Sequence, residues 1–105
     1  MIRRHCEWMT ERIKAEYPDF QAKRAEGEEF YNGIVFDIPW QQEVEYVLWM
    51  LEEIPKLATG RFTDDGQFRW ELEKSQRWVG FVRGWGWKCG FWSINELREQ
   101  VRPGR

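Results

Sequence analysis

Apolar residues recur at helical spacing near the start of the chain, with charged residues at most positions between them. The stripe consists of Ile2, Cys6, Met9 and Ile13, at successive steps of four, three and four residues. This spacing places the side chains on one face of a helix. Because Pro18 disfavours a helical conformation of the residue before it, the pattern predicts a helix over residues 2–17.

A second apolar stripe follows Pro39. It is formed by Val44, Val47, Leu48, Leu51 and Ile54. Proline suits a first helical turn, and Pro55 can end or bend a helix. The pattern therefore predicts a helix over about residues 39–54.

The third stripe is the longest and consists of Phe68, Leu72, Ser75, Val79 and Val82. The strands of a hairpin would alternate instead, so the stripe favours a helix. The Asp-Asp-Gly sequence before it can form a hairpin turn or a helix cap in which Asp64 pairs with Gln67, and we favour the cap. The expected helix covers about residues 64–88 and ends before Gly90.

A fourth helix is expected over about residues 93–102, because Ser93 and Glu96 have the spacing of a capping box. Its apolar face would carry Ile94, Leu97 and Val101. Residues 30–38 differ from the rest of the chain, since they are aromatic and β-branched and contain Asn-Gly.

The pattern as a whole predicts a mainly α, single-domain, four-helix arrangement spanning residues 1–105, with a short extended or hairpin segment near residues 30–38. Eight Trp, seven Phe and three Tyr in 105 residues supply enough apolar surface for one core. No apolar run approaches the roughly 18 residues of a membrane span, and the N-terminus lacks the apolar stretch of a signal peptide. We therefore expect a cytoplasmic protein.

Chemistry-bearing residues are few. Cys6 and Cys89 lie 83 positions apart without a Cys-x-x-Cys motif, and we expect both to be small core residues. His5 is the one histidine, which leaves too few ligands for zinc, and no metal or cofactor is expected. Phosphate-binding loops and nucleophile motifs are absent, and neighbouring carboxylates lack acid–base spacing, so no catalytic residue is assigned and we do not expect an enzyme.

Charge is unevenly distributed. Residues 26–53 contain eight acidic residues and no Lys or Arg, although the whole chain has a formal net charge of −2. This block is either a solvated face paired with arginines of the C-terminal half or a docking surface for a basic protein site. The candidate docking residues are Glu43, Glu45, Glu52 and Glu53.

Residues 77–92 combine glycine, tryptophan and basic residues. Glycine in a helix interior costs about 1 kcal/mol relative to alanine, so Gly80, Gly84 and Gly86 within seven residues require an explanation. Gly80 and Gly84 share one face, where we expect close packing of another helix or an aromatic ring. The tryptophans are either large core residues or part of an exposed Trp/Arg surface. The candidate binding residues here are Arg77, Arg83, Lys88, Trp85, Trp87 and Trp92.

Exposed Trp and Arg suit several partners. They are enriched at protein–protein hot spots, and they also stack on bases and contact phosphates. A nucleotide or single-stranded nucleic acid is therefore the alternative to a protein partner, although an acidic chain disfavours it. A homo-oligomer joined through the Gly80 and Gly84 face is a third possibility, and no membrane contact is expected.

The run Arg77-Trp78-x-Gly80-Phe81-x-x-Gly84, followed by Gly90-x-x-Ser93-Ile94-x-Glu96-Leu97-Arg98, resembles the C-terminal signature of small accessory proteins of tailed bacteriophages and prophages. The likeness covers about the last quarter of the chain. It implies a protein that binds a host protein stoichiometrically, in a defence or DNA-processing complex, and inhibits or modulates it in the bacterial cytoplasm. The resemblance implies no catalytic residues.

Overall fold

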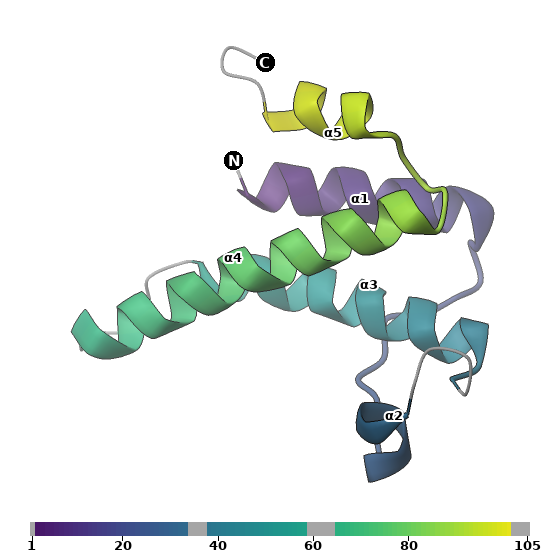
Figure 1. Cartoon of the computed structure of the whole chain (residues 1–105), viewed down its shortest axis with the longest axis horizontal. Helices are drawn as coiled ribbons and strands as arrows, with labels where there is room; N and C mark the ends of the chain where they lie inside the picture. The colour runs from purple at the N-terminus through teal and green to yellow at the C-terminus, as the bar shows by residue number, and fades with distance from the viewer. Residues whose placement is uncertain (1, 34–37, 59–64, 102–105) are drawn as a thin grey trace.

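Five α-helices make up most of the computed structural model, which describes residues 2–33, 38–58 and 65–101. They are α1 (Ile2–Glu16), α2 (Glu28–Asn32), α3 (Trp40–Leu57), α4 (Asp65–Lys88) and α5 (Ile94–Val101). Helix α3 packs against both α1 and α4, and α2 lies on the far side of α3 from α1 (Figure 1). The described residues contain no strand, and the predicted mainly-α fold is confirmed.

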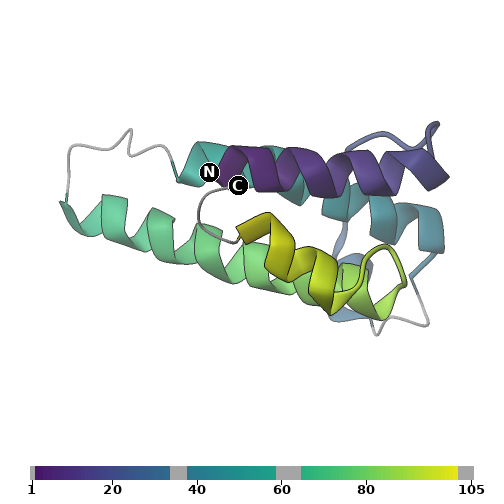
Figure 2. The ribbon, with the colours of Figure 1, turned by 90° about the horizontal axis from the view of Figure 1, so that it is seen from above.

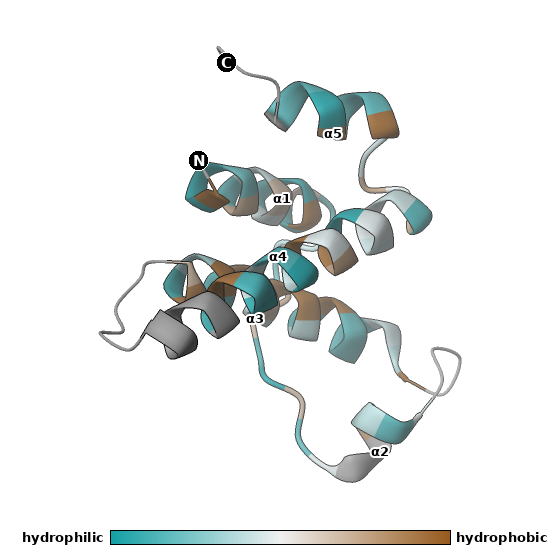
Figure 3. Ribbon diagram, turned by 60° about the vertical axis from the view of Figure 1, so that its left-hand side comes forward, coloured by the Kyte–Doolittle hydropathy of each residue, from teal (hydrophilic) through white to brown (hydrophobic). Residues whose placement is uncertain are grey.

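The core lies where α1, α3 and α4 meet. In α1, the predicted residues Cys6, Met9 and Ile13 are at most 2% exposed. All five predicted residues of α3 are buried as well. Seen from above, α1 covers α3 while α4 runs alongside (Figure 2), and hydrophobic positions recur between hydrophilic ones on these helices (Figure 3). Burial of the two stripes explains why their periodicity was a sound guide to the helices.

The apolar stripes of α4 and α5 are less regular. Ser75 and Val82 are fully buried in α4, whereas Leu72 and Val79 are half-buried. In α5, Leu97 is buried. Ile94, on the same predicted face, is 46% exposed, so this face is only partly buried.

Helix α3 continues through Pro55 and ends at Leu57, three residues beyond the predicted end. Proline cannot donate the usual backbone hydrogen bond, yet its ring is buried here. The N–H of Ala58 donates to the carbonyl of Ile54 at 3.2 Å, which closes a further turn. Pro55 therefore lies buried within the helix and does not end it.

The segment expected to be extended begins as a helix, and this part of the prediction is wrong. Residues 28–32 form α2, while residues 34–37 lie outside the described part of the chain. The ring of Phe30 packs on Tyr46 of α3, with 4.8 Å between centroids, and the Tyr31 hydroxyl donates to the carbonyl of Ala25 at 3.0 Å. These tertiary contacts outweigh the β-propensity of the aromatic residues.

The end of α4 has a Schellman motif. Gly90 has a φ of +87°, which favours glycine, and its N–H donates to the carbonyl of Trp87. The N–H of Phe91 donates to the carbonyl of Gly86 at 2.8 Å, and the Phe91 ring packs on Trp85. The predicted helix end at Gly90 is confirmed, and the motif turns the chain back along α4.

The predicted capping box of α5 is confirmed. The N–H of Ser93 donates to Glu96 Oε1 at 3.0 Å, and the N–H of Glu96 donates to Ser93 Oγ at 3.1 Å. Glu96 also forms an ion pair with Arg12 of α1, and Arg12 donates to the carbonyl of Phe91 at 2.8 Å. Helix α5 is therefore tied to α1 as well as to α4. The proposed cap at Asp64 lies outside the described residues.

Candidate functional site

The outer face of α4 is an exposed stripe that mixes aromatic, basic and small residues. Phe81 and Trp87 are 56% and 51% exposed, which is unusual for such large apolar side chains. Helical spacing of three and four residues continues the stripe through other exposed positions. We define the outer face of α4 by Arg77, Gly80, Phe81, Gly84, Trp87 and Lys88, all of which are exposed.

The predicted close packing at Gly80 and Gly84 is wrong within this chain. A Cβ atom built at either position has no heavy atom within 4 Å, so no helix or ring of the described chain covers these glycines. The close approach occurs two residues later, at Gly86. There a Cβ atom would lie 1.9 Å from the ring of Trp92. The sequence therefore predicted close packing in the correct segment but at the wrong glycines. The chain reversal after α4 places the Trp92 ring over Gly86 and not over Gly80 or Gly84.

The predicted tryptophan surface divides into three environments. Trp92 is only 3% exposed and its indole N–H donates to the carbonyl of Arg83 at 2.9 Å, so its assignment as an exposed binding residue is wrong. Trp85 is half-buried and stacks on both Trp40 and Phe91, which also stack on each other. Only Trp87 of the three is mainly exposed. The Schellman motif explains the burial of Trp92, since it places the residues after Gly90 over the inner side of α4.

The basic candidates are also separated by burial. Arg77 and Lys88 are exposed on the outer face of α4. Arg83 is half-buried, and its Nε is buried without a hydrogen-bond partner in the described structure. A side chain in this environment is poorly placed to contact an external phosphate.

Two of the four acidic candidates have structural roles. Glu43 accepts a hydrogen bond from the indole N–H of Trp85 at 2.7 Å, and Glu45 accepts one from the backbone N–H of Gln21 at 2.9 Å. Their side chains join α3 to α4 and to the segment after α1. The sequence predicted either a solvated face paired with arginines or a docking surface, and Glu43 and Glu45 have neither of these roles.

The other two acidic candidates lie near the end of α3. Glu53 pairs with Lys56 at 3.6 Å, which is a surface ion pair of small energetic value. Glu52 is exposed beside a cavity of about 480 Å³ between α1 and α3. The four glutamates therefore do not form one uniform docking surface.

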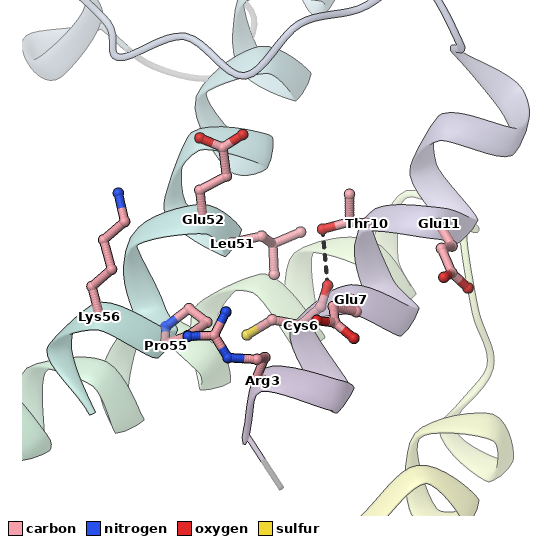
Figure 4. A pocket seen from close by; sticks show the side chains of 9 residues that line it. All are labelled: Arg3, Cys6, Glu7, Thr10, Glu11, Leu51, Glu52, Pro55 and Lys56. Carbon is pink, nitrogen blue, oxygen red and sulfur yellow. Dashed lines mark hydrogen bonds between the residues drawn. The ribbon is translucent and has the colours of Figure 1, made fainter. Parts of the chain in front are cut away.

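The cavity beside Glu52 has Cys6 near its centre and a charged rim of residues from α1 and α3 (Figure 4). Thr10 Oγ1 donates to the carbonyl of Cys6 at 2.8 Å (Figure 4). Burial, followed by the charge of Glu7, raises the pKa of the Cys6 thiol to about 11. The thiol is therefore protonated at neutral pH and is not an activated nucleophile.

Of the two cysteines expected in the core, only one is buried. Cys89 is exposed, so its prediction as a core residue is wrong, whereas Cys6 is buried as expected. His5 belongs to α1, is only 7% exposed and stacks on Trp8 with 6.0 Å between centroids. Among the described residues, no group of three or more His, Cys, Asp or Glu side chains is arranged to hold a metal ion.

A second cavity, also of about 480 Å³, lies between α2, α3 and α4 and was not identified from the sequence. Aromatic side chains dominate its walls. The described lining consists of Phe30, Tyr31, Gly33, Ile38, Glu43, Tyr46, Val47, Phe81 and Trp85. We call it the aromatic pocket. These residues come from three separate segments, so no local sequence motif predicts the pocket.

Comparison of the chain with protein-family models, curated proteins and solved structures gives no match. None of the helices in the described portion is both long and apolar enough to cross a membrane.

Proposed function

We propose that this chain binds another protein stoichiometrically through the outer face of α4 and thereby inhibits or modulates that protein. The observation that carries the proposal is the exposure of Phe81 and Trp87 on one helix, at 56% and 51%. Large exposed aromatic residues are energetically unfavourable in water and mark interaction surfaces when they gather in one place.

The composition of this face suits a protein partner. Tryptophan and arginine dominate binding hot spots, and Arg77 and Lys88 supply positive charge beside the rings. Gly80 and Gly84 leave the helix backbone accessible to a partner's side chains. A complementary surface would offer apolar pockets with an acidic rim.

The residues of the phage-like signature fall into two groups, one with structural roles and one on the surface, and this supports the proposal. Gly90, Ser93 and Glu96 form the helix end and the capping box, so their pattern follows from folding alone. Gly80 and Phe81 take part in neither of these two motifs, and both are exposed. If the resemblance reflects common function, the partner is a host protein of a defence or DNA-processing complex.

Affinity capture from bacterial lysate tests the proposal, with tagged wild type compared with Phe81→Ala/Trp87→Ala. Ile94→Ala is the matched control, since Ile94 is a similarly exposed apolar residue on α5. We expect one host protein to be retained by wild type and control and lost with the double variant, in nuclease-treated lysate as well. Equal retention by all three forms would overturn the proposal.

Two other outcomes identify the alternatives. Nucleic acid retained only without nuclease would favour a nucleotide or single-stranded nucleic-acid binder. A mass that rises with concentration in light scattering, and is reduced by Gly84→Leu, would favour a homo-oligomer joined through the outer face of α4.

A further inference from the structure

The aromatic pocket has the geometry of a box. Phe30 and Tyr31 meet at an interplanar angle of 79°, and Tyr31 and Tyr46 meet at 85°. Phe30 and Tyr46 are inclined at 54°, with 4.8 Å between centroids. Three rings at steep angles thus form adjoining walls, and Phe81 and Trp85 of α4 line the same cavity.

Several contacts fix these walls in place. The Tyr31 hydroxyl donates to the carbonyl of Ala25, and the Trp85 indole N–H donates to Glu43 Oε2 at 2.7 Å. Tyr46 also packs on Trp49, with 5.5 Å between centroids. A preorganised wall loses little conformational freedom when a ligand enters.

The charged side chain among the described lining residues of the pocket is acidic, which favours a positively charged ligand. Glu43 is the one ionisable acid or base in its described lining other than the two tyrosines. Burial, followed by Tyr31, raises the pKa of the Tyr46 hydroxyl, so this residue contributes a neutral ring. The faces of aromatic rings attract cations, and a carboxylate beside them adds a direct charge interaction.

Few side-chain hydrogen-bond acceptors occur among the described lining residues, and this favours one kind of cation. A primary ammonium group has three N–H donors and is strongly hydrated, so it needs several acceptors. Among the described lining residues, the side-chain acceptors are the hydroxyls of the two tyrosines and the Glu43 carboxylate, which already accepts a hydrogen bond from the Trp85 indole. A quaternary ammonium group has no N–H donor and buries methyl groups against rings.

We propose that the aromatic pocket binds a quaternary ammonium group. The cavity volume of about 480 Å³ lies within the range of small-molecule sites and accommodates the group together with part of the molecule that carries it. The group can belong to a small metabolite or to a trimethylated lysine side chain. This site goes beyond the proposed function, which concerns the outer face of α4. Phe81 belongs to both surfaces, whereas Trp87 lies on the outer face and outside the described lining of the pocket.

The test is a titration of the full chain followed by the indole N–H signal of Trp85 in NMR spectra, assigned with Trp85→Phe. Choline is the small-molecule probe, and a short trimethyllysine peptide is the protein-side-chain probe. The uncharged carbon isostere dimethylbutanol and the same peptide with unmodified lysine are the controls. We expect saturable shifts with choline or the trimethyllysine peptide, and much weaker ones with both controls.

Variants separate charge from ring contributions. Glu43→Gln keeps an oxygen that can accept from Trp85 but removes the charge, and we expect about tenfold weaker binding. Phe81→Leu removes a ring that lines the pocket, and its matched control is Trp87→Leu, an exposed ring on the same helix outside the described lining. Phe81→Leu should weaken choline binding several-fold, while Trp87→Leu should leave it unchanged.

The tighter of the two probes identifies the source of the ammonium group. Equal shifts with choline and dimethylbutanol would overturn the proposal, because binding would then depend on shape without charge. Absence of saturable shifts with both quaternary probes, or equal binding of the unmodified lysine peptide, would also overturn it. Loss of protein capture in Trp87→Leu, with choline binding unchanged, would separate failure of one proposal from failure of the other, because Trp87 lies outside the described lining of the pocket.

Discussion

The two sides of α4 carry the same residue types in opposite environments. On the inner side, Gly86 lies beneath the buried ring of Trp92, and a Cβ atom there would overlap that ring. On the outer side, Gly80 and Gly84 have open space above them, and Trp87 is mainly exposed. The comparison shows that a glycine next to a tryptophan in the sequence does not by itself predict close packing. Whether a ring lies over the glycine depends on which segment the fold places there.

Gly86→Ala should have the largest effect on stability. The added methyl group would force movement of the Trp92 ring, which is buried and hydrogen-bonded to the carbonyl of Arg83. We expect a loss of about 2–3 kcal/mol in the free energy of unfolding, despite the better helix propensity of alanine. Urea denaturation measures the loss. An unchanged midpoint would show that Trp92 does not pack on Gly86.

Gly80→Ala and Gly84→Ala should have the opposite sign. Both positions are helical and open, so each substitution should stabilise the fold by roughly 0.5–1 kcal/mol through backbone entropy. Thermal denaturation of the single and double variants checks this. A destabilised monomer would mean that something in the chain covers these glycines.

The buried His5 of α1 should make the stability of the fold depend on pH. Burial, followed by the charge of Arg83 on α4, lowers the pKa of His5 below 6.5. The unfolded state therefore binds a proton that the folded state does not, and stability should fall as the pH drops below about 6.5. Urea denaturation at several pH values measures the slope. His5→Phe can still stack on Trp8, and it should remove the contribution of His5 to this pH dependence. An identical slope in the variant would show that His5 is not its source.

The smallest expected effect concerns Glu96, on the exposed side of α5. Its hydrogen bonds with Arg12 and Ser93 lower the pKa of the carboxyl group. Stability from this group is present above the unfolded pKa and is lost as the pH falls through the folded pKa, at lower pH than for His5. Glu96→Gln should flatten this acidic part of the profile slightly. If Glu96→Gln changed the pH dependence of stability as much as His5→Phe does, the prediction that Glu96 contributes less than His5 would be wrong.

Parts of the candidate site were visible in the sequence because they follow from position along one helix. Arg77, Trp87 and Lys88 were candidate binding residues of the possible Trp/Arg surface, and all three are exposed. Trp92 was assigned to the same surface, but the reversal after Gly90 buries it. The aromatic pocket could not be predicted, because Tyr31, Tyr46 and Phe81 come from three segments whose meeting depends on tertiary packing.

The sequence by itself determined the mainly helical fold, the stripes of α1 and α3, the helix end at Gly90 and the capping box of α5. These features depend on residues within a few positions of one another, where helical periodicity and local hydrogen bonding act directly. Tertiary structure alone decided that residues 28–32 are helical, that Glu43 binds Trp85, and that Gly86 rather than Gly80 meets a ring. Each of these depends on which distant segment packs alongside, and local sequence does not encode that choice.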